Sequence, residues 1–450
     1  ALHGDGPVSG AVVVGGGPVG LVAAILLKRK GFSVTLLERE SELGGLMRSL
    51  PVIDGFEFDN GTRFVPRLGD ARLDADALAP RENWLEFNRL PSGSYFAGRF
   101  QEATGFLDTN GLSAPVREAV EAGYFDAGGS EDAETVDEFL RGRFGAAALH
   151  HVLGPALTKI TGLAPSELSP GVAALYGLSR LVMFTPERTR ALKADPGHDA
   201  RLAFHSRDEG APSDPSRVFR YPARGGIGYW AQRLEAIARD EGVLIRTGLA
   251  AEKVEPGAAG GARLTLTDGT LLDAEKLVWS VPGALLLRAA GALPPGPPPR
   301  MTSGLALYHF VVDRPFATDL FYITNYDPAF ASYRVTLYPN VQGGPMRDGQ
   351  YHLTVEVILN AHRSEAPPSA QIADELARMG VVAPGTCVLA EAITHVRQGF
   401  PLPTPGLAAQ QTAHGERLAG LFPDALVLGR GQAGAFFLRD ALGEAVRALA

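Results

Sequence analysis

The sequence contains very little cysteine and no long apolar run, and both absences exclude classes of protein. Cys387 is the single cysteine, so neither a disulfide within the chain nor a cysteine-based zinc site is available. No stretch approaches about 18 uninterrupted apolar residues, which excludes a membrane-spanning helix. We therefore expect a cytoplasmic protein with no membrane partner and no metal site, in which Cys387 is a buried structural thiol.

Basic residues are also fewer than acidic ones. The chain carries 42 Lys and Arg against 50 Asp and Glu, which gives a formal net charge of -8 at pH 7. Because binding to a phosphate backbone depends on a surplus of Lys and Arg, we expect no nucleic-acid partner. A few arginines can still hold a small anionic substrate. We also expect residues 1–10 to form a flexible leader without a cleavable signal. At the C-terminal end we expect no membrane anchor.

Glycine, by contrast, is abundant, and the first glycine cluster has the spacing GxGxxG. The run AVVVGG predicts a strand, GPVGLVAAILLKRKG a helix that ends at Gly31, and SVTLLER a second strand. In such a βαβ unit Gly15 permits a tight turn, Gly17 lets backbone approach a pyrophosphate at the helix N-terminus, and Gly20 allows close helix packing. Glu38, at the end of the second strand, is placed to accept hydrogen bonds from an adenosine ribose, which disfavours NADP. The alternative is a tight turn that binds no nucleotide.

The segment after Glu38 indicates whether the predicted dinucleotide is FAD or NAD. A plain dehydrogenase continues into another helix, whereas this chain continues with RESELGGLMRS and then GFEFDNGTRF. The pair Gly44 and Gly45 brings backbone close to a long, extended cofactor, and Arg48 is positioned to neutralise its pyrophosphate. The continuation favours noncovalent FAD as the cofactor.

A second GxGxxG lies near the end of the chain, at Gly429, Gly431 and Gly434. A second dinucleotide site would need a complete βαβ unit, and only one helix fits after Gly434. We therefore do not expect a second dinucleotide site at this turn. The predicted cofactor contacts are Gly15, Gly17, Pro18, Gly20, Glu38, Arg39, Gly45, Leu46, Arg48, Thr62, Arg63, Val254, Gly429, Arg430, Ala435 and Phe436.

The order of motifs predicts an α/β fold with two lobes, as the length of 450 residues also suggests. A Rossmann-type FAD-binding lobe is expected to be discontinuous, over residues 1–70, 215–295 and 383–450. A substrate lobe of mixed β-sheet plus helices is expected over residues 71–214 and 296–382. The proline-rich GALPPGPPPR marks one boundary between them.

With these features together, the sequence resembles the flavoprotein superfamily of amine oxidases, protoporphyrinogen oxidases, carotene desaturases and UDP-galactopyranose mutases. The N-terminal segments GGGPVGL, LLERESELGG and GFEFDNGTRF resemble all of its members. The later segments FASYRVTLYPN, YHLTVEV, GFPLPTPG and LVLGRGQAGAF look most like the mutases. That resemblance implies that Arg334 binds a diphosphate and that Asn340 matches a nearby asparagine. The superfamily resemblance also implies that the second glycine turn closes over the same FAD, with Arg430 as a contact. Arg63 stands where mutases carry a histidine near the flavin, and no lysine lies near residue 303, where amine oxidases usually have one.

Two enzymatic functions fit these features. The first is an FAD-dependent oxidoreductase that dehydrogenates a small organic substrate by hydride transfer to the flavin. The alternative is a mutase-like isomerase that uses reduced FAD on a nucleotide sugar, and a flavin-binding protein without turnover is a third class. For either enzyme, the predicted site residues are Arg63, Arg334 and Asn340. We expect a small-molecule substrate, either anionic or a nucleotide sugar. We also expect the protein to form a homodimer.

Other residues have two open interpretations. A buried arginine needs a partner, so Arg334 pairs either with a carboxylate of the fold or with an anionic substrate group. His309 and His352 lie on predicted strands, as packing residues or as part of the site. A dense group of tyrosines belongs either to an aromatic-walled cavity or to the core: Tyr322, Tyr326, Tyr333 and Tyr338.

Overall fold

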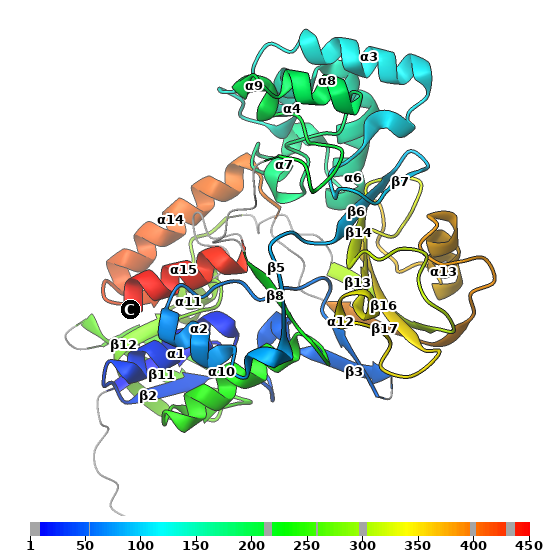
Figure 1. Cartoon of the computed structure of the whole chain (residues 1–450). Helices are drawn as coiled ribbons and strands as arrows, with labels where there is room; N and C mark the ends of the chain where they lie inside the picture. The colour runs from blue at the N-terminus through cyan, green and yellow to red at the C-terminus, as the bar shows by residue number, and fades with distance from the viewer. Residues whose placement is uncertain are drawn as a thin grey trace, which may run out of the picture.

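The computed structural model consists of two lobes, each built on its own sheet (Figure 1). It describes residues 10–53, 55–210, 218–257, 260–296, 304–396, 402–428 and 437–450. Within these ranges, none of the helices is both long and apolar enough to cross a membrane.

The first sheet belongs to the Rossmann-like lobe and combines strands from the beginning, middle and end of the sequence. Its central strands are parallel, and two antiparallel strands extend one edge. In order across the sheet the strands are β10 (Ala251–Pro256), β11 (Ala262–Leu266), β12 (Leu271–Trp279), β1 (Gly10–Val14), β2 (Val34–Leu37) and β9 (Leu244–Arg246), with β18 (Leu426–Val427) paired to β12.

Helices cover both faces of this sheet, which explains why β1 is apolar at every position. Ala11 and Val13 join one buried cluster, whereas Val12 and Val14 join another on the opposite face. A parallel strand covered on both faces reads as a continuous apolar run rather than an alternating one. The helices around the sheet are α1 (Pro18–Arg29), α2 (Ala71–Ala77), α10 (Gly228–Asp240), α11 (Gly283–Ala289), α14 (Pro405–Leu421) and α15 (Leu438–Leu449).

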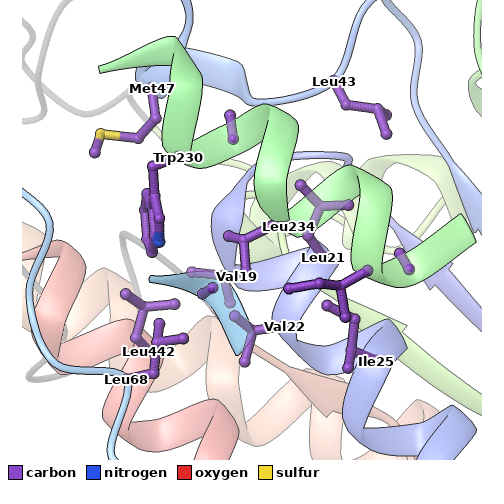
Figure 2. Close-up of a cluster of buried hydrophobic side chains, with 14 of the residues drawn as sticks. Val19, Leu21, Val22, Ile25, Leu43, Met47, Leu68, Trp230, Leu234 and Leu442 are labelled. Carbon is purple, nitrogen blue, oxygen red and sulfur yellow. The ribbon is translucent and has the colours of Figure 1, made fainter. Parts of the chain in front are cut away.

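The core of this lobe unites three distant parts of the chain. Figure 2 shows Val22 and Ile25 of α1 in the same buried cluster as Trp230 of α10 and Leu442 of α15. Trp230 is fully buried, so it is a packing residue. The expected α/β class with a Rossmann-type lobe is confirmed.

The second sheet is mixed and stands beside the first lobe. Its strands in order are β17 (Val388–Val396), β13 (Gly304–Val312), β16 (Tyr351–Leu359), β15 (Arg334–Leu337), β14 (Tyr322–Asn325), β6 (Ser92–Phe96) and β7 (Arg99–Gln101). Among the described strands of this sheet, β14 and β6 pair in parallel and the other pairs are antiparallel. Helix α13 (Ser369–Arg378) covers one face, where Ile372 and Leu376 join the apolar side chains of β13, β15 and β16.

A group of helices extends this second lobe at the top of Figure 1. Their apolar faces share one cluster with side chains of β13 and β16. The helices are α3 (Ala114–Phe125), α4 (Val136–Phe144), α5 (Ala146–Ala148), the π-helical turn η4 (Leu149–Leu153), α6 (Gly154–Thr161), α7 (Val172–Leu175), α8 (Pro186–Leu192) and α9 (Pro196–Asp199), with 3₁₀ turns η3 (Thr109–Gly111) and η5 (Pro165–Glu167).

Short elements connect the two lobes. The hairpin of β3 (Ser49–Ile53) and β4 (Phe56–Asp59) reaches from the first lobe to the second sheet, where β4 packs on β16. The remaining elements are η1 (Gly45–Met47), η2 (Arg81–Asn83), a ribbon of β5 (Trp84–Phe87) and β8 (Phe219–Pro222), and α12 (Tyr338–Gln342).

Two details differ from the expectations from sequence. The boundary at residue 383 assigns β17 to the FAD-binding lobe, but this strand pairs with β13 in the second sheet. The prediction that Cys387 is a buried thiol is wrong, because Cys387 is exposed just before β17 begins. Its backbone N–H, rather than its thiol, is held by Asp313 Oδ1 at 2.9 Å.

Candidate functional site

The first glycine loop connects β1 to α1, and it requires glycine at two positions, one for its backbone conformation and one for close packing. Gly15 has a φ of +105°, in the left-handed region that favours glycine. A Cβ at Gly20 would lie 1.8 Å from the carbonyl oxygen of Gly15 and 2.8 Å from Ser280 Oγ. Gly20 therefore lets α1 pack directly against the end of β1, as its place in the motif predicts.

Gly17 is different, because its surroundings are open. Among the described residues, no heavy atom lies within 4 Å of the position that a Cβ at Gly17 would take, its chain neighbours aside. The second glycine pair lies against this loop, since Gly44 N donates to Gly16 O at 2.8 Å. A Cβ at Gly45 would lie 3.5 Å from Gly17 Cα. Gly17 and Gly45 thus form one open backbone surface, whereas Gly16 and Gly44 beside them are buried under side chains.

Helix α1 starts from this surface with its N–H groups available. Gly17 is its N-cap, Pro18 is in the first turn, and within this described helix no acidic residue or side-chain cap occupies that turn. The partial positive charge of a helix N-terminus favours an anion at such a position. The open backbone and the uncapped helix together fit the pyrophosphate of a dinucleotide.

Glu38 is fixed at the end of β2 beside the same loop. One carboxylate oxygen, Oε2, accepts from Gly16 N at 2.6 Å, and Oε1 accepts from Glu40 N at 2.9 Å. Each oxygen can accept more than one hydrogen bond, so the oriented carboxylate still has acceptor capacity for ribose hydroxyls. This geometry suits the predicted role of Glu38.

The remaining predicted cofactor contacts of this lobe differ in how they are placed. Arg48 lies on the glycine pair, with its Nε donating to Gly45 O at 3.2 Å, and Leu46 beside it is 37% exposed. The Arg39 guanidinium instead pairs with Glu40 at 3.1 Å on the surface. Val254 is buried in β10, opposite Leu264. Four predicted contacts lie outside the described residues: Gly429, Arg430, Ala435 and Phe436.

The chain then runs from the glycine pair onto the second sheet. Asn60 Nδ2 donates to Arg48 O at 3.3 Å, and two residues later Thr62 N donates to Glu356 Oε1 at 2.8 Å. Thr62 Oγ1 also lies 2.6 Å from Thr336 Oγ1. A Cβ at Gly61 would lie only 2.8 Å from Glu356 Cδ, so the segment packs tightly on β15 and β16. These contacts bring Thr62 and Arg63 to the face of the second sheet.

Two arginines and one carboxylate meet there, and we name Arg63, Glu356 and Arg334 the two-arginine cluster. Arg334 stands directly opposite Glu356 in the β15–β16 register. The Nε atoms of Arg63 and Arg334 are both buried, and neither has a hydrogen-bond partner among the described residues. Both side chains remain partly accessible to solvent. The cluster therefore has guanidinium donors that none of the described residues uses.

Burial and the neighbouring charges shift the pKa values of both arginines. Burial lowers the pKa of Arg63, with Glu356 opposing the shift and Arg334 adding to it. Burial also disfavours the charged form of Arg334, but the neighbouring Tyr333 phenol and the Glu356 carboxylate outweigh burial and raise its pKa. Because a guanidinium stays protonated in proteins, both arginines keep their positive charge.

Tyrosines surround Arg334. The Tyr333 hydroxyl accepts from Arg334 Nη2 at 3.1 Å, and the guanidinium carbon lies 5.0 Å from the Tyr333 ring centre and 5.8 Å from that of Tyr322. Tyr326 and Tyr176 interact electrostatically with the same group. The structure thus brings three of the four predicted tyrosines to Arg334. The fourth, Tyr338, instead contacts Asp59 and His352.

The loop that carries Tyr326 and Tyr333 is fixed by two buried charges. Lys159 Nζ donates to the carbonyl oxygens of Asn325, Asp327 and Ser332, each at 2.8 Å. The Glu375 carboxylate accepts from the backbone N–H groups of Ala331 and Ser332, each at 2.8 Å. Burial lowers the pKa of Lys159 to about 7, with Glu375 opposing the shift.

Replacing Lys159 is expected to loosen this loop. Lys159→Met keeps the apolar stem but leaves three buried carbonyl groups without their donor, so we expect a loss of about 2 kcal/mol of folding free energy. Chemical denaturation at a pH below 7, where the ammonium is charged, measures the difference. Lys253→Met is the control, because Lys253 is exposed and pairs with Glu255 on the surface, and such pairs contribute about 0–1 kcal/mol. Equal losses in both variants would contradict the assigned role of Lys159.

Asp59 is a second buried carboxyl near Arg63. Its Oδ2 accepts from Tyr221 Oη at 2.7 Å and its Oδ1 from Ile227 N at 2.8 Å. Burial raises the pKa of Asp59 to about 7, although the bonds from Tyr221 and Ile227 oppose the shift. The side chain links the β3–β4 hairpin to the start of α10.

Several other candidate residues have structural partners. Asn340 Nδ2 donates to the carbonyl oxygens of Thr318 and Leu320, both at 2.7 Å, so its amide hydrogens hold a loop. His309 bridges Thr354 and Thr394. Burial lowers the pKa of both His309 and His352 to about 4, so both are neutral packing residues at neutral pH. Among the described residues, no cluster of His, Cys, Asp and Glu could hold a metal ion.

Sequence reasoning missed three of the residues that build this site. Glu356 is a lone carboxylate in the apolar strand YHLTVEVIL, and Lys159 is a lone cation in the helix GPALTKIT. A charged residue inside an apolar element is a usable signal, since burial of a charge requires a partner. Asp59 stood inside a quoted motif, but its partners come from distant segments.

Comparisons with known proteins agree with this geometry. Residues 13–73 match the family model of the NAD(P)-binding Rossmann-like domain. Hydroxyneurosporene desaturase of Rubrivivax gelatinosus is 30% identical over 309 residues, which cover 64% of this chain and 55% of the desaturase. The chain thus spans about half the length of this relative.

Solved structures share the fold over nearly the whole chain. Reduced UDP-galactopyranose mutase superposes with a TM-score of 0.74 at 18% identity, covering 97% of this chain and 93% of the mutase. Wild-type putrescine oxidase bound to putrescine gives a TM-score of 0.61 at 15% identity, covering 98% of each chain. At these identities the likeness shows the fold alone.

Proposed function

We propose that the chain is an FAD-dependent oxidoreductase of the amine oxidase-type superfamily, acting on a small organic substrate with an acidic group. The open backbone at Gly17, against which Gly45 packs, supports the cofactor assignment. The unused guanidinium donors of the two-arginine cluster support the acidic group.

Each part of the first lobe has a role toward the cofactor in this proposal. The N-terminus of α1 and the backbone at Gly17 hold the pyrophosphate, Glu38 accepts from the ribose hydroxyls, and Arg48 adds a compensating charge. When bound, FAD supplies the hydride acceptor. The protein contributes position and electrostatics.

The second lobe binds and orients the substrate. Arg63 and Arg334 hold the acidic group through charge-assisted hydrogen bonds. The tyrosines around Arg334 cover the apolar part of the substrate and exclude water from it. Lys159 and Glu375 keep the Tyr326–Tyr333 loop in place, so this wall is formed before substrate binds.

The mutase alternative has less support. The desaturase relative that aligns with 64% of this chain is an oxidoreductase by name. The likeness to the mutase, at 18% identity, is one of fold. The two reactions differ in electron balance, because an oxidoreductase reduces its flavin with substrate, whereas a mutase needs flavin that is already reduced and returns it unchanged.

A panel of small acids, amines and nucleotide sugars, mixed anaerobically with the FAD-loaded protein, tests the proposal. We expect an acidic substrate to bleach the flavin absorbance, and Arg334→Ala to weaken its apparent affinity about 100-fold through loss of a charge-assisted bond. Arg263→Ala is the control, because Arg263 pairs with Asp273 on the surface.

Two outcomes would overturn the proposal. If neutral substrates bleach the flavin and Arg334→Ala does not change this reaction, the substrate needs no acidic group and that part of the proposal is wrong. Conversion of a nucleotide sugar by the pre-reduced protein, without net oxidation, would establish the mutase reaction instead.

A further inference from the structure

We propose that Glu356 determines the charge of the substrate, restricting its acidic group to a single negative charge such as a carboxylate. The inference rests on the proposed function, since it concerns the acidic group that the two-arginine cluster binds. It adds a selection against doubly charged groups such as phosphate monoesters.

Glu356 is held in one position by the protein. Its side chain is 5% exposed, and Oε1 accepts from Thr62 N at 2.8 Å and from Thr62 Oγ1 at 3.2 Å. Gly61 packs so closely on the carboxyl group that a Cβ there would lie 2.8 Å from Cδ. The carboxylate therefore cannot turn away when a ligand enters.

The charges of the cluster do not cancel. Two guanidinium groups face one carboxylate, since Arg334 stands opposite Glu356 and Arg63 follows Thr62. The nearby phenols of Tyr326 and Tyr333 are neutral, because burial raises their pKa values above the ordinary range. Asp59 also interacts electrostatically with Arg63, but burial raises the pKa of Asp59 to about 7, so much of this carboxyl group is protonated and neutral at neutral pH. The cluster is therefore left with a net positive charge of at most about one.

This remaining charge matches a monoanion. A carboxylate that engages the free Nε–H groups would bring the cluster to neutrality. A dianion would place a second negative charge beside the fixed Glu356 carboxylate, where low polarity strengthens repulsion. Specificity in protein sites commonly comes from such a repulsive element as well as from attraction.

Three aryl probes separate charge from shape: benzoate, phenyl phosphate and methyl phenyl phosphate. At about pH 7 phenyl phosphate carries close to two negative charges, because the second pKa of a phosphate monoester is about 6. The methyl ester keeps the phosphate geometry with one charge. Isothermal titration calorimetry of the FAD-loaded protein should show both monoanions binding at least about tenfold tighter than phenyl phosphate.

The Glu356→Gln variant tests the residue itself. Glutamine retains the oxygen that accepts from Thr62 N but removes the charge, so phenyl phosphate should bind about tenfold tighter than to the parent and the preference should disappear. Glu241→Gln is the control, since Glu241 is a partly buried carboxylate of the first lobe that pairs with Arg29, away from the two-arginine cluster. It should keep the ligand order of the parent.

The proposal is overturned if the parent prefers phenyl phosphate, binds none of the three probes, or distinguishes the two phosphates no better than Glu356→Gln does. If Glu356→Gln does not fold, the comparison of the two phosphates on the parent still decides. Because calorimetry measures binding without turnover, a correct ligand order with no flavin bleaching would refute the proposed function alone. Bleaching by a substrate with no charge preference would refute this inference alone.

Discussion

Gly17→Ala is expected to remove most FAD binding while leaving the fold intact. Gly17 has a φ of -73° and a ψ of 175°, which alanine adopts without strain. Among the described residues the new methyl group would meet no heavy atom within 4 Å, apart from its chain neighbours. It would occupy only the space through which a pyrophosphate approaches the loop, so we expect FAD affinity to fall about 100-fold or more, equivalent to about 2.7 kcal/mol.

Gly20→Ala provides the contrast. Its Cβ would lie 1.8 Å from a backbone oxygen that cannot move without displacing β1 from α1. We expect this variant to lose several kcal/mol of folding free energy, at or above the roughly 1–3 kcal/mol typical of overpacking. Thermal unfolding of the apoproteins and fluorescence titration with FAD separate the two effects. Unchanged FAD affinity in Gly17→Ala would show that the cofactor does not approach this backbone.

The first lobe could be predicted from sequence because its constraints are local. The turn at Gly15, the helix packing at Gly20 and the carboxylate of Glu38 all act within one βαβ unit of residues 10–38. Each residue type is required by backbone conformation or by close approach, so its position in the sequence defines its role. The second glycine pair was predictable for the same reason, since Gly44 bonds to Gly16 in the adjacent loop.

The two-arginine cluster could be predicted only in part. The motif and the resemblance indicated Arg63 and Arg334, but their common partner Glu356 contacts Thr62 across a sequence separation of 294 residues. Such a pairing depends on strand register, and no local pattern in β16 indicates which residue stands opposite Arg334. The pairing of β17 with β13 has the same cause, because β14, β15 and β16 lie between these two strands in the sequence.

The tyrosines show how an element boundary changes the outcome. Tyr333 lies just before β15 and contacts Arg334. Tyr338 lies just past the end of that strand, where α12 begins, and its hydroxyl reaches the Asp59 backbone instead. The number of aromatic residues in the sequence does not reveal that Tyr333 and Tyr338 contact different groups.

Asp59→Asn is expected to change the pH dependence of folding stability between about pH 4 and about pH 7. The folded state raises the pKa of Asp59 from 3.8 to about 7, chiefly through burial. A carboxyl group with a raised pKa stabilises the folded state fully below its unfolded pKa, and this contribution is lost as pH rises through about 7. Asparagine fits the same partners, accepting from Ile227 N and donating to the Tyr221 oxygen.

The parent should therefore lose stability relative to Asp59→Asn as pH rises from about 4 to about 7. Each pKa unit corresponds to about 1.4 kcal/mol, so the total change in the difference is on the order of 4 kcal/mol. Chemical denaturation midpoints of FAD-saturated protein across this range measure it. Tyr221→Phe should move the window to higher pH, because the lost hydroxyl favours the ionised carboxylate. A difference between parent and Asp59→Asn that stays constant with pH would mean that Asp59 is ionised throughout, and that Arg63 supplies the charge that keeps it so.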